Sequence, residues 1–166
     1  MRLAEVMQAL PSILLALLFL TVLGSITTVL VLAIGLATWA VVARVVRAQV
    51  LAEKQLTYVE AAYSIGCSRP RVLIRHVLPN ILGPVIVLMA FGIPQAIFTE
   101  AFLSFVGLGP PPPNPSWGRL LADAFPYVQT SAHYILFPSL VLSLTLLAFN
   151  FLGDGVRDAF DPHQSR

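Results

Sequence analysis

The sequence predicts an all-α fold, a polytopic transmembrane helical bundle of about four spans in a single domain over residues 1–166. Of the 166 residues, 57% are hydrophobic and 11% are charged, whereas soluble domains carry about 25% charged residues. No charged side chain occurs between Glu5 and Arg44, and this run far exceeds the ~20 residues that cross a bilayer. A soluble core helix therefore does not explain the sequence.

The cations are concentrated in one segment between apolar runs. Six of the ten are Arg44, Arg47, Lys54, Arg69, Arg71 and Arg75. The other four are Arg2, before the first apolar run, Arg157 and Arg166, after the last, and Arg119. Because short cytoplasmic loops carry an excess of Lys and Arg, we expect both termini and the 47–79 segment to be cytoplasmic. By the same rule, the 106–132 segment is extracytoplasmic.

The apolar stretch before Arg44 is too long for one ordinary crossing and is interrupted at Gly24. We predict a tight hairpin of two spans, at about 11–24 and 27–46. Two crossings return the chain to the side on which Arg44 lies, and one crossing does not. The first span is short, so we expect tilt or local thinning of the bilayer.

The segment after the hairpin alternates helix formers with helix-ending residues. The good helix formers of 47–56 predict that the second span continues as a helix into the cytoplasm. We then expect a helix over 60–65 that Gly66 ends in a left-handed cap. Ser68 is suited to the N-cap of a further short helix. Pro79 interrupts the helical pattern just before the next membrane segment.

Two more apolar runs predict the remaining spans, at 80–99 and 133–152. The first contains Gly83, Pro84, Gly92 and Pro94. Such residues are tolerated in membrane helices that neighbouring helices cover, so we expect this span to pack inside the bundle and to kink. The proline-rich run 110–118 predicts an extended outward loop, and residues 153–166 predict a polar cytoplasmic tail.

The stretch EAAYSIGCSRPRVLIRHVLPN, residues 60–80, is a polar, basic island between the apolar runs. It has a Glu-Ala-Ala triplet, a glycine four residues after the second alanine, and a His-x-Leu-Pro-Asn ending. The small Ala61 and Ala62 permit a partner to approach closely, and Glu60 offers a charge to a partner's Arg or Lys. This pattern resembles the EAA loop of binding-protein-dependent ABC importer permeases.

Other motifs extend the resemblance over nearly all of the chain. They are WAVVARVVRAQV at 39–50, EAFLSFVGLG at 100–109, PSWG at 115–118 and FNFLGDGVRDAFDP at 149–162. Together they look like the "C" type permease of the peptide and nickel subfamily, in the type I ABC importer permease fold. Members of that family typically have six spans and an N-terminal extension. The resemblance therefore implies either an inactive fragment, beginning where the third span would lie, or a shortened permease.

The resemblance implies a role for the island. In that family, the EAA loop forms the coupling helix that docks in a groove of a cytoplasmic ATPase. The implied coupling residues are Glu60, Ala61, Ala62, Gly66, Arg69 and His76. For His76, a helix-end residue that only packs or is solvated is an equal alternative. Pro79 and Asn80 are expected to form the hinge back into the membrane.

The implied function is that of a membrane-spanning permease subunit of an ATP-driven importer. Such an importer moves di- or oligopeptides, or a small solute such as nickel, across the cytoplasmic (inner) membrane. The implied mechanism is alternating access. The implied partners are a second permease subunit, two cytoplasmic ABC ATPase subunits, an extracytoplasmic solute-binding protein and membrane lipid. We expect no nucleic acid and no cofactor in this chain, since ATP and Mg²⁺ would be held by the ATPase. Lys54, the only lysine, follows Ala52 and Glu53, which excludes a phosphate-binding loop. No GxSxG, HExxH or paired Cys/His ligands occur either, so we expect no catalytic residues.

Several side chains have competing interpretations. Glu100 is the only acidic residue close to a span, so it is either a pathway or gating residue or a hydrated structural one. Asn150 predicts an interhelical hydrogen bond. The acidic side chains Asp154, Asp158 and Asp161 favour a solvated helix end over a metal site.

Other classes of protein fit the sequence less well. A DNA-binding helix-turn-helix needs a third supporting helix, which the island lacks. A secondary transporter would need a network of ionisable residues within its spans, and Glu100 alone is present. A non-transporting membrane scaffold would not need the EAA pattern.

Overall fold

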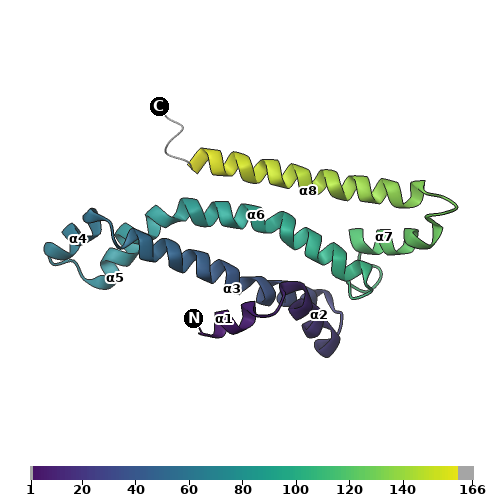
Figure 1. Cartoon of the computed structure of the whole chain (residues 1–166), viewed down its shortest axis with the longest axis horizontal. Coiled ribbons are helices and arrows are strands. Elements are labelled where there is room, and N and C mark those ends of the chain that lie inside the picture. The colour runs from purple at the N-terminus through teal and green to yellow at the C-terminus, as the bar shows by residue number, and fades with distance from the viewer. Residues whose placement is uncertain (1, 161–166) are drawn as a thin grey trace.

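The computed structural model describes residues 2–160, which contain helices and no strand. Three long helices, α3 (Thr27–Glu53), α6 (Leu78–Phe105) and α8 (His133–Phe160), run side by side along the longest axis of the molecule (Figure 1), and α6 lies between the other two. In the described part of the chain, three helical stretches are long and apolar enough to cross a membrane. These are the predicted second, third and fourth spans, so the all-α prediction is confirmed.

The first predicted span, 11–24, is short, as expected. Its helix α2 (Ser12–Leu23) has 12 residues, and at 1.5 Å per residue it is about 18 Å long, shorter than a ~30 Å hydrocarbon core, so its crossing of the membrane stays a prediction. Pro11 lacks an N–H group and separates α2 from α1 (Arg2–Gln8). The predicted hairpin is confirmed, because Gly24 turns the chain with a φ of 87°.

The first two helices pack back along α3. Between α2 and α3 lies an apolar cluster that also takes in Leu103 of α6: Ala16, Leu20, Leu30 and Ala33. α1 lies against the later part of α3, where Ala4 and Glu5 share a cavity with Arg44 and Arg47. The ends of α1 and α3 that carry charge therefore lie at one level.

The chain between α3 and α6 folds into short helices. α3 ends at Glu53, three residues earlier than predicted, and is followed by α4 (Thr57–Ser64), α5 (Arg69–Val72) and the π-helical turn η1 (Leu73–Val77). The predicted interruption at Pro79 is wrong, because residues 69–105 form one continuous helix. The Leu78 N–H donates to the Leu73 carbonyl, five residues back. This wider turn accommodates the proline ring that a regular α-helix would exclude.

The opposite end of the bundle is folded rather than simply extended. α6 continues to Phe105, six residues beyond the predicted end of its span, and Pro84 and Pro94 lie within it. Residues 110–115 are not helical, as predicted, but the unpredicted helix α7 (Trp117–Ala124) and the short turn η2 (Phe125–Tyr127) follow. A Cβ on Gly118 would lie 1.8 Å from the Ala101 carbonyl oxygen, so glycine is needed for α7 to touch α6.

The predicted tail is also largely helical. α8 begins at His133, as predicted, and continues to Phe160 instead of ending at 152. Gly153 is buried, and the ring of Phe91 on α6 packs against α8 at this position. Asp161 and the rest of the predicted tail lie outside the described residues.

Candidate functional site

The island forms a small lobe at one end of the bundle (Figure 1), which we call the α4–α5 lobe and define as residues 57–77. It has its own apolar cluster, made of buried residues of the lobe and of the start of α6: Val59, Ala62, Val72, Val77 and Ile81. Val46 and Val50 of α3 pack against this cluster from the side. The lobe is therefore fixed to both long helices by buried apolar contacts.

A complete C-terminal cap ends α4 inside the lobe. Gly66 has a φ of 85°, and its N–H donates to the Tyr63 carbonyl at 3.0 Å. The Cys67 N–H donates to the Ala62 carbonyl, five residues back, at 3.1 Å. These two bonds define the Schellman motif, so the predicted left-handed cap at Gly66 is confirmed. Ser68 occupies the N-cap position of α5, but its hydroxyl makes no capping hydrogen bond.

The Glu-Ala-Ala triplet is divided between the two faces of α4. Glu60 and Ala61 are exposed, and Ala62 is 5% exposed and belongs to the core of the lobe. The expectation that Ala62 offers a partner close approach is therefore wrong, since its small side chain serves internal packing. Arg69 is exposed and His76 is half-buried.

Sequence reasoning missed the apolar part of the outer surface of the lobe. Ile65 is 81% exposed and Ile74 is 65% exposed, and the Tyr63 ring stands partly clear of the lobe. These exposed apolar side chains are available for contact with a partner. The signal in the sequence was the position of Ile65, directly before the capping glycine, where no core can cover it.

A hydrogen-bonded clamp joins the lobe to α3 and α6. The Tyr58 hydroxyl donates to Glu53 Oε1 at 2.5 Å and receives a bond from Asn80 Nδ2 at 2.8 Å. Asn80 Nδ2 also donates to the His76 carbonyl at 2.9 Å. Burial raises the pKa of the Tyr58 phenol, and the bond and charge of Glu53 raise it further, whereas the bond from Asn80 lowers it.

The clamp changes the interpretation of three predicted residues. Pro79 and Asn80 lie within a continuous helix, and Asn80 ties that helix to α4. Their role as a hinge stays a prediction. His76 takes part through its backbone carbonyl. Sequence reasoning missed Glu53 and Tyr58, because the contact that completes the clamp joins Tyr58 to Asn80, 22 positions later, and no local pattern indicates it.

The other end of the bundle carries Glu100 within α6, five residues before the helix ends. Its carboxylate is half-buried and accepts a 2.6 Å hydrogen bond from Ser104 Oγ. A cavity of about 320 Å³ adjoins it, lined by Pro115, Ser116, Trp117 and Leu120. A pathway or gating role for Glu100 stays a prediction.

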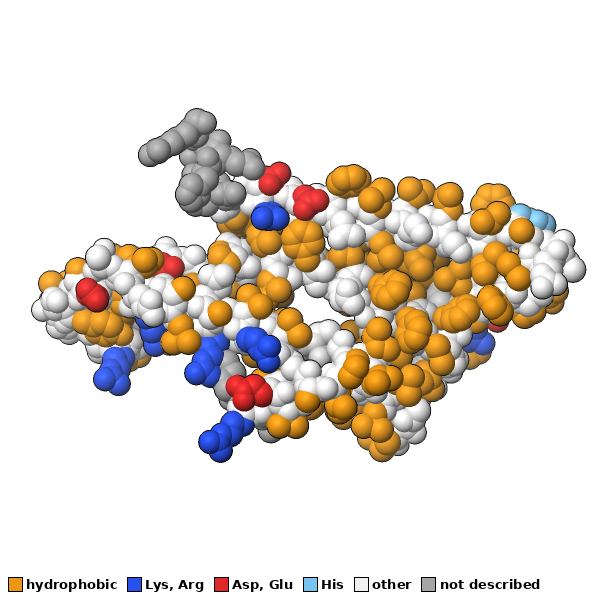
Figure 2. Space-filling view, viewed as in Figure 1, with side chains coloured by type: hydrophobic (Ala, Val, Ile, Leu, Met, Phe, Trp, Pro, Cys, Tyr) orange, Lys and Arg blue, Asp and Glu red, His pale blue; other side chains and the backbone are white. Residues whose placement is uncertain are grey.

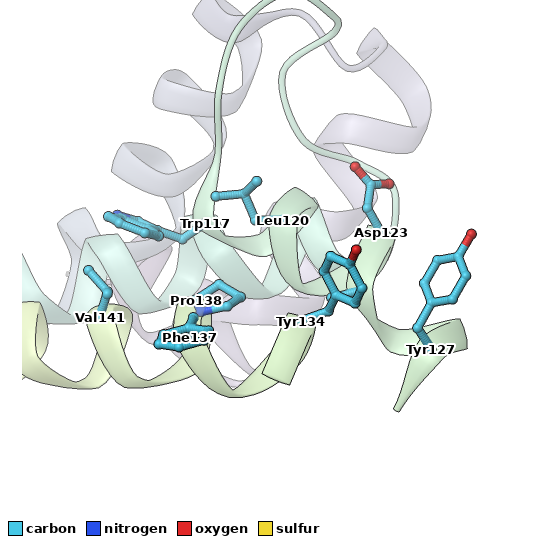
Figure 3. A pocket seen from close by; sticks show the side chains of 9 residues that line it. Trp117, Leu120, Asp123, Tyr127, Tyr134, Phe137, Pro138 and Val141 are labelled. Carbon is cyan, nitrogen blue, oxygen red and sulfur yellow. The ribbon is translucent and has the colours of Figure 1, made fainter. Parts of the chain in front are cut away.

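A larger groove of about 710 Å³ lies between α7 and α8 at the same end. Aromatic and apolar side chains of both helices line it, and the Asp123 carboxylate stands at one end beside Tyr134 (Figure 3). Further along α8, Asn150 is exposed and donates to the Leu146 carbonyl of its own helix. The predicted interhelical bond of Asn150 is therefore wrong among the described residues. Across residues 2–160 no group of three or more His, Cys, Asp or Glu side chains is placed to hold a metal ion.

Known proteins resemble this chain over nearly its whole length. Residues 1–166 match the family described as binding-protein-dependent transport system inner membrane component. The oligopeptide transport system permease protein OppC of Bacillus subtilis is 40% identical over 98% of this chain and 53% of its own length. OppC of Salmonella typhimurium is 42% identical over 98% of this chain and 54% of its own length. The glutathione transport system permease protein GsiD of Pectobacterium atrosepticum is 43% identical over 98% of this chain and 54% of its own length. The chain spans about half the length of the curated relatives it matches.

Proposed function

The chain belongs to the family of binding-protein-dependent transport system inner membrane components, and from this membership we propose that it forms part of the permease of an ATP-driven peptide importer. Three helices of membrane-spanning length make it a multi-pass membrane protein. Relatives named for oligopeptide and glutathione transport support peptides as the substrate class.

The observation that carries the proposal is the construction of the α4–α5 lobe. Its outer face presents the exposed Glu60, Ala61 and Ile65. Its inner face is fixed by the buried cluster and by the Tyr58 clamp. A displacement of this face therefore moves the lobe as a body, and the continuous helix 69–105 carries the movement into the membrane. A lobe built in this way is suited to receive motion from an ATPase.

The partners follow from the same proposal. Two cytoplasmic ATPase subunits engage this lobe and its counterpart on a second permease subunit, and a solute-binding protein delivers peptide at the α7 end. ATP biases the pore only if the docking contact differs between its inward-open and outward-open states. In this arrangement the α4–α5 lobe and the N-terminus of α1 are cytoplasmic, and the ATPase performs the hydrolysis.

Co-purification with a candidate ATPase tests the proposal. The variant Glu60→Arg reverses an exposed charge, and Gly66→Pro removes the cap because proline cannot adopt a φ of 85°. We expect both variants to lose ATPase capture. The control Asp154→Arg reverses another exposed charge, on α8 and outside the lobe, and retains capture. Undiminished capture by both lobe variants would refute coupling through this surface.

A further inference from the structure

A basic cavity of about 290 Å³ lies between α1 and α3, away from the coupling surface. Arg44 and Arg47 of α3 line it with Glu5 of α1. Spaced three residues apart, the two arginines project from one side of α3, and both are exposed. Figure 2 shows positive side chains gathered around α1 and the adjoining part of α3, with an acidic one among them. Among the described residues no ion pair neutralises either arginine.

The position of this cavity along α3 matches the edge of a membrane. The helix has no charge from Thr27 to Ala43. At 1.5 Å per residue, Arg44 and Arg47 lie about 26 and 30 Å from Thr27, close to the ~30 Å thickness of a hydrocarbon core. When Thr27 lies at one face of that core, both arginines lie at the headgroup level of the other. The α4–α5 lobe begins ten residues after Arg47 and extends beyond this level.

We propose that the cavity between α1 and α3 binds the headgroup of an anionic phospholipid. Guanidinium groups bind phosphate oxygens through paired hydrogen bonds, so Arg44 and Arg47 engage the phosphodiester. The two arginines outnumber the single carboxylate of the lining, that of Glu5. Glu5 accepts a hydrogen bond from a headgroup hydroxyl, which favours a lipid such as phosphatidylglycerol.

Two alternative roles for these arginines account for less of the structure. Arginines that only set the topology of the chain need no cavity and no second helix across from them. An acidic segment of a partner protein would approach from the aqueous side, whereas the apolar Ala4, Ala48 and Leu51 complete the lining. A lipid fits both the charged and the apolar lining of the cavity, with its phosphate on the arginines and its acyl chains along α3. The inference requires a membrane-spanning chain but not transport, so it survives a failed ATPase capture.

A tryptophan placed on the cavity side of α3 supplies a test. Val41 is exposed and lies three residues before Arg44 and seven before Ala48, so it is on the same side of the helix and about 4.5 Å deeper in the membrane. The chain with Val41→Trp, Trp39→Phe and Trp117→Phe is reconstituted in phosphatidylcholine containing increasing fractions of either brominated phosphatidylglycerol or brominated phosphatidylcholine. Quenching of the introduced tryptophan by the two brominated lipids gives their relative binding constant.

We expect phosphatidylglycerol to be preferred by about fivefold, the effect of roughly one uncompensated cation at an anionic surface. The pair Arg44→Gln and Arg47→Gln removes the preference, the pair Arg44→Lys and Arg47→Lys keeps part of it, and the control Arg71→Gln keeps it in full. With Trp39→Phe alone, Trp117 in α7, at the other end of the bundle, is the one tryptophan and reports equal quenching by both lipids.

Helix content by circular dichroism confirms that each variant folds, and each single Arg→Gln change gives an intermediate preference if the double change does not fold. Equal quenching of the tryptophan introduced at position 41 by the two lipids would overturn the proposal. A preference that persists without both arginine charges would overturn it equally, because the selectivity would then come from elsewhere on the protein.

Discussion

Removal of one hydroxyl group from the clamp should loosen the α4–α5 lobe without unfolding the bundle. Tyr58→Phe deletes the bond to Glu53, at 2.5 Å, and the bond from Asn80, at 2.8 Å. A hydrogen bond to a charged group contributes about 1.5–3 kcal/mol and a neutral one about 0.5–1.5 kcal/mol. Because Tyr58 is half-buried, water can compensate in part for each lost hydrogen bond, and the lower values of these two ranges apply. The lobe should therefore lose about 2 kcal/mol of local stability.

Hydrogen exchange measures this loss directly. A decrease of about 2 kcal/mol in the free energy of local opening speeds exchange by about 30-fold. The amides to follow are those of α4 and its cap, including Cys67, whose N–H bonds to the Ala62 carbonyl. Amides in the middle of α8 should keep their rates, because no hydrogen bond of the clamp involves α8.

A matched control lies on the same helix. In the described part of the chain Tyr63 has no hydrogen-bond partner for its hydroxyl, and its ring is 41% exposed. Tyr63→Phe should leave exchange in α4 unchanged. If Tyr58→Phe also leaves it unchanged, or if it accelerates exchange uniformly over all helices, the clamp does not hold the lobe in the way we describe.

Three further predictions concern single positions. Gly118→Ala should lower the thermal unfolding midpoint, since its Cβ would overlap the Ala101 carbonyl and overpacking costs about 1–3 kcal/mol. The control Gly92→Ala should leave the midpoint unchanged, because no atom lies within 4 Å of a Cβ at that position. Equal midpoints for the two variants would refute the close contact of α7 with α6. Ala62→Leu should destabilise the lobe by a similar ~1–3 kcal/mol. Ala61→Leu should leave the hydrogen exchange of the lobe unchanged and reduce ATPase capture. The reverse pattern would mean that Ala61 faces the core and Ala62 the partner. The phenol of Tyr58 should titrate above the ordinary tyrosine pKa of about 10. The clamp's contribution to the stability of the lobe is therefore complete below pH ~10 and is lost as pH rises through the raised pKa. An ultraviolet titration in which Tyr58→Phe leaves the highest-pH tyrosine step in place would contradict this.

The sequence predicted features that local chemistry decides. Gly66 could be recognised as a cap because a positive φ is a property of the glycine itself. The long spans could be recognised because uncharged runs of that length have no stable place in water. The shortness of the first span could be predicted as well, because Pro11 and Gly24 bound its apolar run and α2 occupies Ser12–Leu23 between them.

Features that depend on distant contacts were not predictable in the same way. The clamp joins Tyr58 to Asn80 across 22 positions, and neither residue is unusual in its own segment. α7 depends on Gly118 meeting the backbone of α6, and near the end of α8 the ring of Phe91 packs over Gly153. In each case the deciding partner lies on another helix, which the pattern of one segment does not reveal.

The Glu-Ala-Ala triplet shows a limit of a different kind, because the error there was avoidable from helix geometry. Successive residues of an α-helix are about 100° apart, so neighbours such as Ala61 and Ala62 can lie on either side of the boundary between an exposed face and a buried face. The side chains that share a face are four residues apart, which places Ile65 with Ala61 on the exposed side. The same spacing leaves Ala62 with Val59, three residues before it, in the core of the lobe. A motif written as adjacent letters therefore combines two requirements, a small residue that lets a partner approach and a small residue that lets the lobe close on itself.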